Sequence, residues 1–305
     1  MHVTIILCTY NGEKFLLEQL KSIEEQEYND WSLLASDDGS TDQTMTILSN
    51  FQGRLGQERI NIIKGPGQGY AANFTNTCAQ AKNTSDAFAF CDQDDVWHPK
   101  KLSTATQRLR EFNREKPALY CSRTELIDSE GRHITNSKFF LQTPCFENAM
   151  VQSLAGGNTM VFNTAARDMI VQLAHCKYMV AHDWMLYQLV TGAGGTVIYE
   201  PWPSISYRQH GDNVIGSNQA IKARLKRLRL LLKGQMKNWN DRNIDCLSEI
   251  EDKLTPGARQ TLALFKHARA HPYTTLLRNP LFRPFHRQSN LGTAALIIGL
   301  LLRRI

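Results

Sequence analysis

Residues 87–99 read Ala-Phe-Ala-Phe-Cys-Asp-Gln-Asp-Asp-Val-Trp-His-Pro, so five apolar residues are followed at once by three carboxylates within four positions. A short apolar run that ends in polar residues predicts a buried strand. Neighbouring carboxylates raise one another's pKa, so a strand end rarely holds three unless a cation or hydrogen-bond donors neutralise them. The stretch therefore predicts a site for a hard divalent cation, Mg²⁺ or Mn²⁺, or else a solvated acidic turn that caps a helix.

The chain before this stretch alternates between strand and helix patterns. Short apolar runs predict strands, and the segments between them carry apolar residues at helical spacing, including a helix capped by Ser40 or Thr41. Such alternation indicates a mostly parallel sheet with crossover helices, which binds ligands at the carboxyl ends of its strands. Polar residues follow three of the predicted strands: Thr9-Tyr10-Asn11 after Val3–Leu7, Asp37-Asp38 after Trp31–Ala35, and Asp92–Asp95 after Ala87–Cys91.

Beyond residue 100 the pattern is less regular. It predicts helices over 102–112 and 181–190, and strands over 119–121, 159–162 and 205–207. After Gly216 the composition changes, because a narrow stripe of Ile and Leu over 221–233 is surrounded by Lys and Arg. We therefore divide the chain into residues 1–217 and 218–305.

The charge of the chain divides at the same point. The 305 residues are 42% apolar and 21% charged, which fits one large domain or two modest ones and excludes a disordered chain. The net charge of +6 conceals 18 Lys and Arg against 24 Asp and Glu up to Ser217, and 17 against 5 beyond it. Such a basic C-terminal part predicts contact with an anionic surface, either nucleic acid or membrane.

The seven cysteines are scattered and never form a Cys-x-x-Cys pair. This spacing predicts neither a disulfide framework nor a thiolate zinc site, and it favours a reducing compartment. An apolar strand begins after two residues, which predicts no signal peptide. The longest uncharged apolar run, Leu291–Leu302, is shorter than the roughly 20 residues that cross a bilayer.

Four motifs, taken together and in order, resemble those of the family 2 glycosyltransferases. They are Thr9-Tyr10-Asn11-Gly12, Ser36-Asp37-Asp38-Gly39-Ser40-Thr41-Asp42, Cys91-Asp92-Gln93-Asp94-Asp95-Val96-Trp97-His98-Pro99 and His182-Asp183-Trp184. Residues 207–213 further resemble the bacterial rhamnosyltransferase-like branch. The resemblance covers about residues 1–215 and implies an α/β fold of the GT-A type, with a Rossmann-like, mostly parallel central sheet flanked by helices. We expect residues 218–305 to form a C-terminal helical extension.

The resemblance implies a nucleotide-binding pocket. Asp38 matches the acid that accepts the N3–H of a uracil-type base, and a carboxylate suits that edge because it offers one donor between two carbonyls. Asp37 and Asp42 are instead expected to be a turn residue and a neighbour of a helix cap. The residues implied to bind the nucleotide with Asp38 are Thr9, Tyr10, Asn11, Glu13, Asn73 and Asp92. The alternative to a metal role for Asp92 is a hydrogen bond to the donor sugar or the ribose.

The resemblance also implies a metal site. Asp94 matches the last acid of the family's metal-binding DxD motif, and Asp92 matches the first. Asp95, next to Asp94, is expected to contact the donor sugar or the acceptor substrate. A metal there would bridge the diphosphate oxygens and stabilise the charge that builds as the nucleoside diphosphate leaves. His210 is expected to be a further metal or diphosphate contact, with a structural histidine as the alternative, and Arg208 is expected to pair with a phosphate. The expected cofactor is Mg²⁺ or Mn²⁺.

Asp183 matches the acid that family 2 enzymes use as catalytic base. A carboxylate within hydrogen-bond reach can take the proton of the acceptor hydroxyl as the new bond forms. The alternative role for Asp183 is that of a helix N-cap. Trp184 is expected either to stack on an acceptor sugar or to lie in the core. Gly157 and Asn158 resemble an acceptor-side loop, with a simple turn as the alternative.

Two departures from the family pattern narrow the expected function. Ala72 stands where many relatives have an arginine, and the chain lacks the QxxRW motif of polymerising synthases. We predict an inverting, metal-dependent glycosyltransferase that moves one sugar, rhamnose or a hexose, from a UDP- or dTDP-sugar to a lipid-linked glycan acceptor in bacterial cell-surface polysaccharide synthesis. One alternative is a nucleotidyltransferase, but that enzyme needs a glycine-rich phosphate loop with a nearby lysine, and the segment Gly65–Gly69 lacks this pattern. The other alternative is a non-catalytic module that binds nucleotide sugars.

The basic C-terminal part suits an acceptor carried on a membrane. The 221–233 stripe predicts an interfacial helix, and Leu291–Leu302 predicts a shallow anchor. The alternative is that the stripe packs on the catalytic domain. No nucleic-acid motif accompanies the charge, so we expect a cytoplasmic protein that lies peripherally on the inner face of the cell membrane. An aromatic and cationic belt is expected from Tyr273, Phe282 and Phe285 with Arg278, Arg283 and Arg287.

Overall fold

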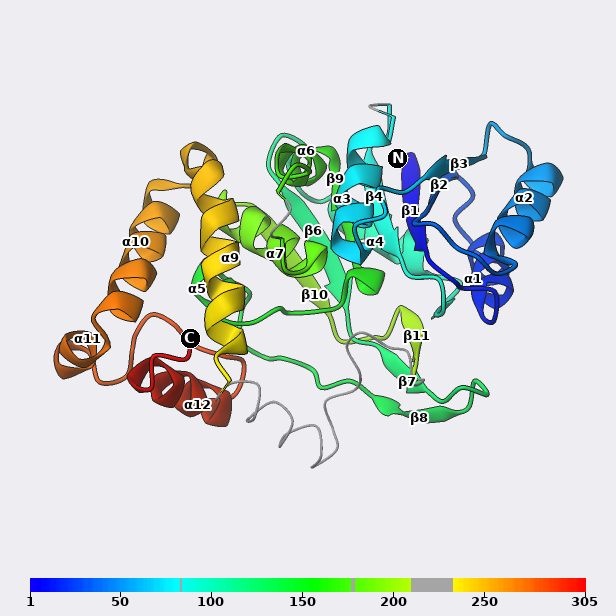
Figure 1. The fold of residues 1–305 in the computed structure, drawn as a ribbon. Helices are drawn as coiled ribbons and strands as arrows, with labels where there is room; N and C mark the ends of the chain where they lie inside the picture. Colours follow the sequence, from blue (N-terminus) through cyan, green and yellow to red (C-terminus); the bar gives the residue numbers. More distant parts are fainter. Residues whose placement is uncertain (83, 177–178, 210–232) are drawn as a thin grey trace.

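The computed structural model describes residues 1–82, 84–176, 179–209 and 233–305 (Figure 1). The strands are β1 (Val3–Thr9), β2 (Trp31–Asp37), β3 (Ile60–Lys64), β4 (Ala87–Cys91), β5 (Val96–Trp97), β6 (Ala118–Ser122), β7 (Glu125–Ile127), β8 (His133–Asn136), β9 (Val161–Asn163), β10 (Thr196–Glu200) and β11 (Ile205–Arg208). His210, the boundary at Ser217 and most of the predicted 221–233 helix lie outside the described residues.

The helices alternate with these strands and then continue without them to the end of the chain. They are α1 (Leu16–Glu24), α2 (Thr44–Leu55), α3 (Tyr70–Gln80), α4 (Lys101–Leu109), α5 (Phe146–Ala149), α6 (Thr164–Gln172), α7 (His182–Gly192), α9 (Gln235–Glu249), α10 (Pro256–Ala270), α11 (Pro272–Arg278) and α12 (Asn290–Leu301), with short 3-10 helices η1 (Gly157–Thr159) and η2 (Glu251–Lys253).

Seven strands form the central sheet, in the order β10-β6-β9-β4-β1-β2-β3. β1 pairs in parallel with β2 and β4, and β2 pairs in parallel with β3, which confirms the predicted parallel sheet. β9 runs antiparallel to both β4 and β6. Thr9 of β1 lies beside Asp37 of β2, and Leu7 of β1 lies beside Cys91 of β4. The acids that follow β2 and β4 therefore leave the sheet at the same edge.

Alternate side chains of the strands cover both faces of this sheet. On β1, Ile5 and Leu7 belong to a core cluster with α1, α2 and α4, whereas Ile6 and Cys8 belong to a cluster with α3, α6 and α7. This separation follows from the two-residue period of a strand. Helices thus lie on both sides of the sheet, as Figure 1 shows and as the expected α/β fold requires.

A second sheet, in the order β5-β11-β7-β8, begins directly after the acidic stretch. β5 pairs antiparallel with β11, and β11 pairs in parallel with β7. The Asp92–Asp95 stretch is therefore the crossing from the large sheet to the small one. Both of its ends are fixed by strand pairing, which limits where its carboxylates can point.

The C-terminal helices extend the core on one face of the large sheet (Figure 1). Ile244 of α9 and Phe265 of α10 belong to the same apolar cluster as α3, α6 and α7. Phe282 and Phe285 are each 1% exposed and contact Phe265. The predicted aromatic belt is therefore wrong at these two positions, because their rings fill the core, while Tyr273 is exposed. No helix within the described residues is both long and apolar enough to cross a membrane.

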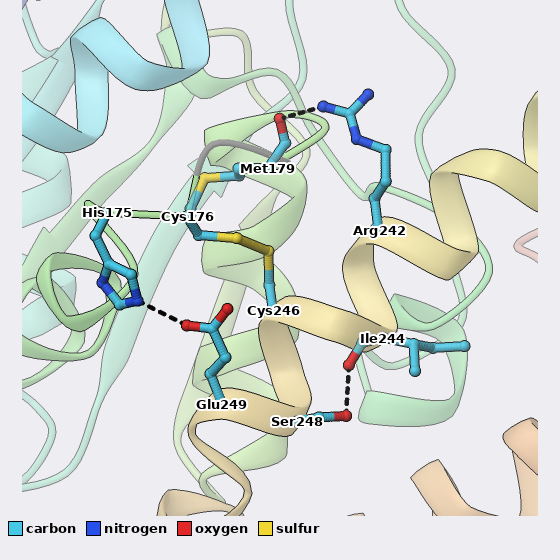
Figure 2. Close-up of a disulfide and its surroundings, with 8 residues drawn as sticks. All are labelled: His175, Cys176, Met179, Arg242, Ile244, Cys246, Ser248 and Glu249. Atoms are coloured by element: carbon cyan, nitrogen blue, oxygen red, sulfur yellow. Dashed lines mark hydrogen bonds and ion pairs between the residues drawn. A yellow bond between two sulfur atoms is a disulfide. The ribbon is translucent and has the colours of Figure 1, made fainter.

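A disulfide joins α9 to the segment that follows α6. Cys176 and Cys246 are bonded across 70 residues, with their Cα atoms 6.6 Å apart (Figure 2). The prediction that the cysteines do not pair is wrong for these two, because the fold brings together residues whose spacing in the sequence gives no signal. The other five cysteines are free.

Candidate active site

The turn after β2 is held by the first of its two acids. Asp37 accepts hydrogen bonds from the hydroxyls of Thr9 and Ser40 at 2.9 and 2.5 Å, and from the backbone N–H groups of Gly39 and Ser40 at 3.1 and 2.8 Å. Asp37 is buried, so it is the turn residue that the sequence predicted. Thr9 is also buried, and its hydroxyl donates to Asp37, so Thr9 stabilises the turn.

The helix after this turn begins later than expected. α2 starts at Thr44, whose backbone N–H and hydroxyl donate to Asp42 at 3.0 and 2.5 Å. The predicted cap at Ser40 or Thr41 is wrong, because the Ser40 hydroxyl donates to Asp37 and the helix N-cap is Gln43. Asp42 is next to the cap, as predicted.

Asp38 holds the glycine-rich loop that follows β3. Its two carboxylate oxygens accept the N–H groups of Gly67 and Gly69 at 2.7 and 3.0 Å. Gly65 lies so close that a Cβ there would stand 2.9 Å from the Asp38 Cα, which explains the glycine. A carboxylate has about four acceptor positions, so the half-buried Asp38 retains the capacity to accept a hydrogen bond from a base.

Three more residues of the predicted nucleotide pocket bind neighbouring parts of the protein. Asn73 is 1% exposed, and both ends of its amide are used within the protein, so it lies behind the pocket. Asn11 and Glu13 join the loop after β1 to the loop after β2. The partners are the Ser36 hydroxyl and carbonyl for Asn73 at 2.6 and 3.1 Å, the Thr41 N–H for Asn11 at 2.9 Å, and the Gln43 N–H for Glu13 at 2.9 Å.

Tyr10, in the loop after β1, has a large aromatic side chain that is 59% exposed. Its backbone N–H donates to Gln93 Oε1 at 2.8 Å, and its carbonyl accepts from Gln93 Nε2 at 3.1 Å. A Cβ on Gly12 would stand 2.4 Å from Gln93 Oε1, so this loop packs directly on the acidic stretch. Sequence reasoning gave Gln93 no role, although its place between two acids of the DxD motif was a signal for one.

The three carboxylates after β4 have different surroundings. Asp95 is 1% exposed and accepts hydrogen bonds from Asn158 Nδ2 at 2.6 Å and from the Arg208 N–H at 3.4 Å. Burial, followed by the charges of Asp94 and Asp92, raises the pKa of Asp95. Burial, followed by the charge of Asp94, raises the pKa of Asp92 to about 7. Burial and mutual repulsion thus distinguish these acids from a solvated turn.

A buried lysine that sequence reasoning missed lies beneath these acids. Lys101 is 1% exposed, donates to the backbone carbonyl of Asn158, and places its Nζ 3.9 Å from the centre of the Trp97 ring. Burial lowers its pKa to about 7, although nearby acids act in the opposite direction. The available signal was its place two residues after Pro99, at the start of a predicted amphipathic helix.

Asp183 lies in the first turn of α7. Its carboxylate accepts the backbone N–H groups of Trp184 and Gly157 at 2.6 and 3.1 Å. The N-cap of α7 is Ala181, so Asp183 is not the N-cap of the alternative reading. Burial raises the pKa of Asp183, and its charge contributes to the raised pKa of Asp92. The predicted base and the predicted DxD acids therefore lie at one site.

The short helix η1 joins these two groups of acids. The N–H of Gly157 donates to Asp183, while the side chain of Asn158 donates to Asp95. A Cβ on Gly157 would stand 2.6 Å from His182 Nε2, so the glycine permits a close approach. His182 is buried among aromatic rings, and burial lowers its pKa to about 3, which makes it a neutral spacer at neutral pH.

Two of the predicted ligand contacts are buried within the protein. Trp184 is 6% exposed and its indole N–H donates to the Ala149 carbonyl at 2.7 Å, so it belongs to the core, the second of its two readings. Arg208 is 2% exposed, forms an ion pair with Glu18 at 2.6 Å and donates to the Asp94 carbonyl at 3.2 Å. The assignment of Arg208 to a phosphate is therefore corrected: it holds the main chain of Asp94.

Tyr70 adds a side chain to the open edge of the site. Its ring is 39% exposed and its hydroxyl donates to the Val180 carbonyl at 3.1 Å. Burial, followed by the charges of Asp183 and Asp92, raises the pKa of Tyr70 to about 12. The hydroxyl therefore lies within electrostatic reach of both predicted groups of acids. The feature of the sequence that could have pointed to Tyr70 is an aromatic residue directly after Gly69, at the end of the glycine-rich segment.

The acids fit a metal that is held jointly with a substrate. Within the described residues, no group of three or more His, Cys, Asp or Glu side chains is arranged to hold a metal ion. Mg²⁺ and Mn²⁺ typically need only one or two carboxylates when water and substrate phosphates fill the other positions. Asp92 and Asp94 supply two, and the pKa of Asp92 is raised by burial and then by the charge of Asp94, although the charge of Lys101 acts in the opposite direction.

Comparison with known proteins identifies the family. The model of the family "Glycosyl transferase family 2" matches residues 4–174, more than half of the chain. The chain belongs to glycosyltransferase family 2. This glycosyltransferase is similar to the dTDP-rhamnosyl transferase RfbG of Shigella flexneri, with 30% identity over 238 residues that span 74% of this chain and 78% of the relative.

Two further proteins resemble this glycosyltransferase. One is the Escherichia coli enzyme WfgD, named UDP-Glc:alpha-D-GlcNAc-diphosphoundecaprenol beta-1,3-glucosyltransferase, which is 35% identical over 101 residues, 33% of this chain and 38% of WfgD. The other is the mannosyltransferase PcManGT of Pyrobaculum calidifontis, solved with GDP-Man and Mn²⁺. It has a TM-score of 0.54 and 16% identity, and the match covers 99% of this chain and 84% of PcManGT. This likeness shows the GT-A glycosyltransferase fold.

Proposed function

We propose that this glycosyltransferase moves a single sugar from a nucleoside diphosphate to a hydroxyl of a glycan acceptor, with inversion at the anomeric carbon. The observation that carries the proposal is the convergence of Asp92, Asp95 and Asp183 at one edge of the sheet, with η1 hydrogen-bonded to acids of both groups. The acids after β4 suit the diphosphate of a donor, and Asp183 suits the hydroxyl of an acceptor.

Asp183 is the proposed catalytic base. Inversion requires the acceptor hydroxyl to attack the face opposite the leaving group, while a carboxylate takes its proton. The raised pKa of Asp183 makes its carboxylate a stronger proton acceptor than an exposed aspartate. The N–H groups of Gly157 and Trp184 orient this carboxylate, and its remaining lone pairs can accept the hydroxyl proton.

The donor is proposed to be a UDP- or dTDP-sugar. Asp38 and the exposed Tyr10 would contact the base, and Asp92 would contact the ribose or the sugar. Rhamnose as the sugar is supported by the similarity to RfbG, and a hexose by the similarity to WfgD. The other residues predicted for this pocket, Thr9, Asn11, Glu13 and Asn73, would act by holding its loops.

Asp94 and Asp92 are the residues that would hold the metal. Bound Mg²⁺ or Mn²⁺ supplies positive charge to the diphosphate of the donor, and the Mn²⁺ in PcManGT supports this choice. Arg208 fixes the main chain of Asp94 through its carbonyl, and Gln93 ties the same stretch to the loop after β1. His210 remains a predicted further ligand.

The acceptor is proposed to be a lipid-linked glycan of bacterial cell-surface polysaccharide synthesis, a proposal supported by the diphosphoundecaprenol acceptor in the name of WfgD. Residues 218–305 would then contact an anionic membrane on its cytoplasmic side. Leu291 and Ile298 of α12 are 79% and 54% exposed, and Arg303 and Arg304 lie shortly after the end of that helix at Leu301. Exposed apolar side chains beside cations suit a membrane interface.

Membrane contact is best tested by substitution, because α9 and α10 share a core with the catalytic part and truncation would remove that core. Leu291→Asp with Ile298→Asp should release the protein from vesicles of anionic phospholipid in a flotation assay. The matched control is Leu141→Asp with Ile134→Asp, because these residues are 86% and 53% exposed and lie outside residues 218–305. Unchanged flotation of the α12 variant would contradict the proposed membrane face.

The proposed reaction is tested with a panel of UDP- and dTDP-sugars and sugar diphosphate lipids, with and without a chelator. We expect one donor to be consumed, the product to have the inverted anomeric configuration by NMR, and transfer to return when Mn²⁺ replaces the chelated metal. Full transfer in the presence of the chelator would contradict the metal role of Asp94. A retained configuration would contradict Asp183 as base.

A further inference from the structure

Helix α9 lies against the segment that leads into Asp183, although the two are far apart in sequence. Covalent, ionic and aromatic contacts join them. These contacts are the disulfide Cys176–Cys246, the ion pair of His175 with Glu249 at 2.8 Å, and the edge-to-face contact of Trp184 with Trp239 at 6.4 Å between ring centres. Figure 2 shows the disulfide and the ion pair that join α9 to the segment before Asp183.

Arg242 projects from the same face of α9. Trp239, Arg242 and Cys246 are separated by three and four residues, a spacing that places side chains on one side of a helix. The guanidinium Nη2 of the half-buried Arg242 donates to the Met179 carbonyl at 3.2 Å, as Figure 2 shows. Arg242 thus reaches the main chain four residues before Asp183.

Arg242 also lies beside Tyr70. The Tyr70 hydroxyl donates to the carbonyl of Val180, which directly follows the residue that Arg242 binds. The charges of Asp183 and Asp92 raise the pKa of Tyr70, whereas the charge of Arg242 lowers it. Two acids of the reaction site and one cation from α9 therefore act on the same hydroxyl.

We propose that Arg242 forms an anion-binding subsite for the diphosphate of a lipid-linked acceptor, an inference that rests on the proposed function. The donor diphosphate is assigned to Asp92 and Asp94, and Arg242 brings a further cation to the segment that leads into Asp183, so we assign this cation to the acceptor. A planar guanidinium donates to phosphate oxygens in a fixed geometry. An acceptor whose hydroxyl reaches Asp183 would place its diphosphate against α9, at the edge marked by Tyr70.

A purely structural role is the alternative for Arg242, because its bond to Met179 positions the chain before Asp183. Arg242→Gln separates the two roles, since a glutamine amide can still donate to a carbonyl but carries no charge. Arg242→Lys keeps the charge and loses the planar donor set. Lys237→Ala is the matched control, because it removes an exposed cation from the same helix.

The experiment measures binding of decyl diphosphate by calorimetry to the full chain, with the donor pocket saturated by Mn²⁺ and whichever of UDP or dTDP binds. We expect Arg242→Ala and Arg242→Gln to weaken binding roughly 10- to 100-fold, Arg242→Lys to weaken it less, and Lys237→Ala to leave it within about twofold. Affinity for the nucleotide should stay unchanged in all four variants. Thermal melting curves check that each variant is folded.

Other outcomes would overturn the inference. Equal affinity of wild type and Arg242→Gln for decyl diphosphate, or no binding to the wild type, leaves Arg242 as a structural residue. Pyrophosphate that binds as tightly as decyl diphosphate, with the same dependence on Arg242, excludes the lipid-linked acceptor as the ligand. If the wild type binds neither UDP nor dTDP with Mn²⁺, the proposed function itself fails, which is a separate result.

Discussion

Two acidic stretches leave the sheet at the same edge, and their carboxylates are used in opposite ways. After β2, Asp37 accepts four hydrogen bonds and Asp38 accepts two, all from the protein. After β4, we find no hydrogen bond to the Asp92 carboxylate among the described residues, and burial with the charge of Asp94 raises its pKa to about 7. Asp37 and Asp38 thus hold loops in place, whereas Asp92 has a carboxylate whose pKa is raised by burial and by a neighbouring acid.

This difference separates structural acids from chemical ones. An acid whose oxygens accept several N–H groups stabilises a turn, so its loss should lower stability. An acid buried with too few donors costs stability, and such groups gather where a ligand or a reaction uses the charge. Substitution of Asp37 should therefore reduce stability, whereas substitution of Asp94 or Asp183 should reduce activity.

Asp183→Asn is the substitution with the largest expected effect. The amide cannot take a proton from the acceptor hydroxyl, so we expect kcat to fall by roughly 10²- to 10⁴-fold. The melting temperature should change little, because loss of one hydrogen bond is offset by relief of the burial that raises the Asp183 pKa. Product formation and scanning fluorimetry measure the two effects. Full activity of Asp183→Asn would show that Asp183 is not the catalytic base.

Asp94→Asn tests the proposed metal side of the same site. Loss of a carboxylate that holds the metal should lower kcat/KM roughly 10²-fold and abolish the rise in melting temperature that Mn²⁺ with nucleotide gives the wild type. Asp252→Asn, an exposed acid in η2, is the control. An Mn²⁺-dependent rise that survives in Asp94→Asn would assign the metal to other residues.

Asp37→Ala tests the structural side. It removes four hydrogen bonds to one buried carboxylate, so we expect the free energy of unfolding to fall by about 2–4 kcal/mol in urea denaturation. At a temperature where the variant is folded, kcat should stay within about tenfold of the wild type, because Asp37 faces the turn. A stable but inactive variant would break the distinction between the two stretches.

The raised pKa of Asp183 predicts a smaller, pH-dependent effect on stability. The folded state holds this proton more tightly than the unfolded chain, so the stabilisation is complete at low pH and is lost as the pH rises through the folded pKa. The slope is at most about 1.4 kcal/mol per pH unit for one proton. Asp183→Asn should lack this component, so identical pH profiles of unfolding free energy in both proteins would contradict it.

The sheet and the order of the acids could be predicted because they depend on local sequence. The apolar run of β4 is short and ends in polar residues, and the two-residue period on β1 separates its two buried faces. Parallel pairing then brings the ends of β2 and β4 together. The convergence of Asp38 with the DxD acids at one edge follows from these patterns alone.

The partners of single side chains could not be predicted in the same way. Arg208 pairs with Glu18, 190 residues earlier, and no local pattern distinguishes this ion pair from a phosphate contact. Aromatic residues among cations look alike whether they fill a core, as Phe282 and Phe285 do, or face a membrane. The disulfide Cys176–Cys246 is a further contact that only the packing of α9 creates.

Glu13→Gln has the smallest expected effect. It tests whether Glu13 is a structural acid, like Asp37, or an acid that contacts the ligand. Glu13 accepts the Gln43 N–H at 2.9 Å at the start of α2, and its own N–H donates to Asp42 at 3.1 Å. Glutamine keeps a carbonyl oxygen for Gln43 but loses the negative charge that favours a helix N-terminus, a cost of at most about 1 kcal/mol. Nucleotide affinity, measured by calorimetry, should stay within about threefold. A tenfold loss of affinity at unchanged stability would place Glu13 against the ligand together with Tyr10, and Glu13 would then not be a purely structural acid.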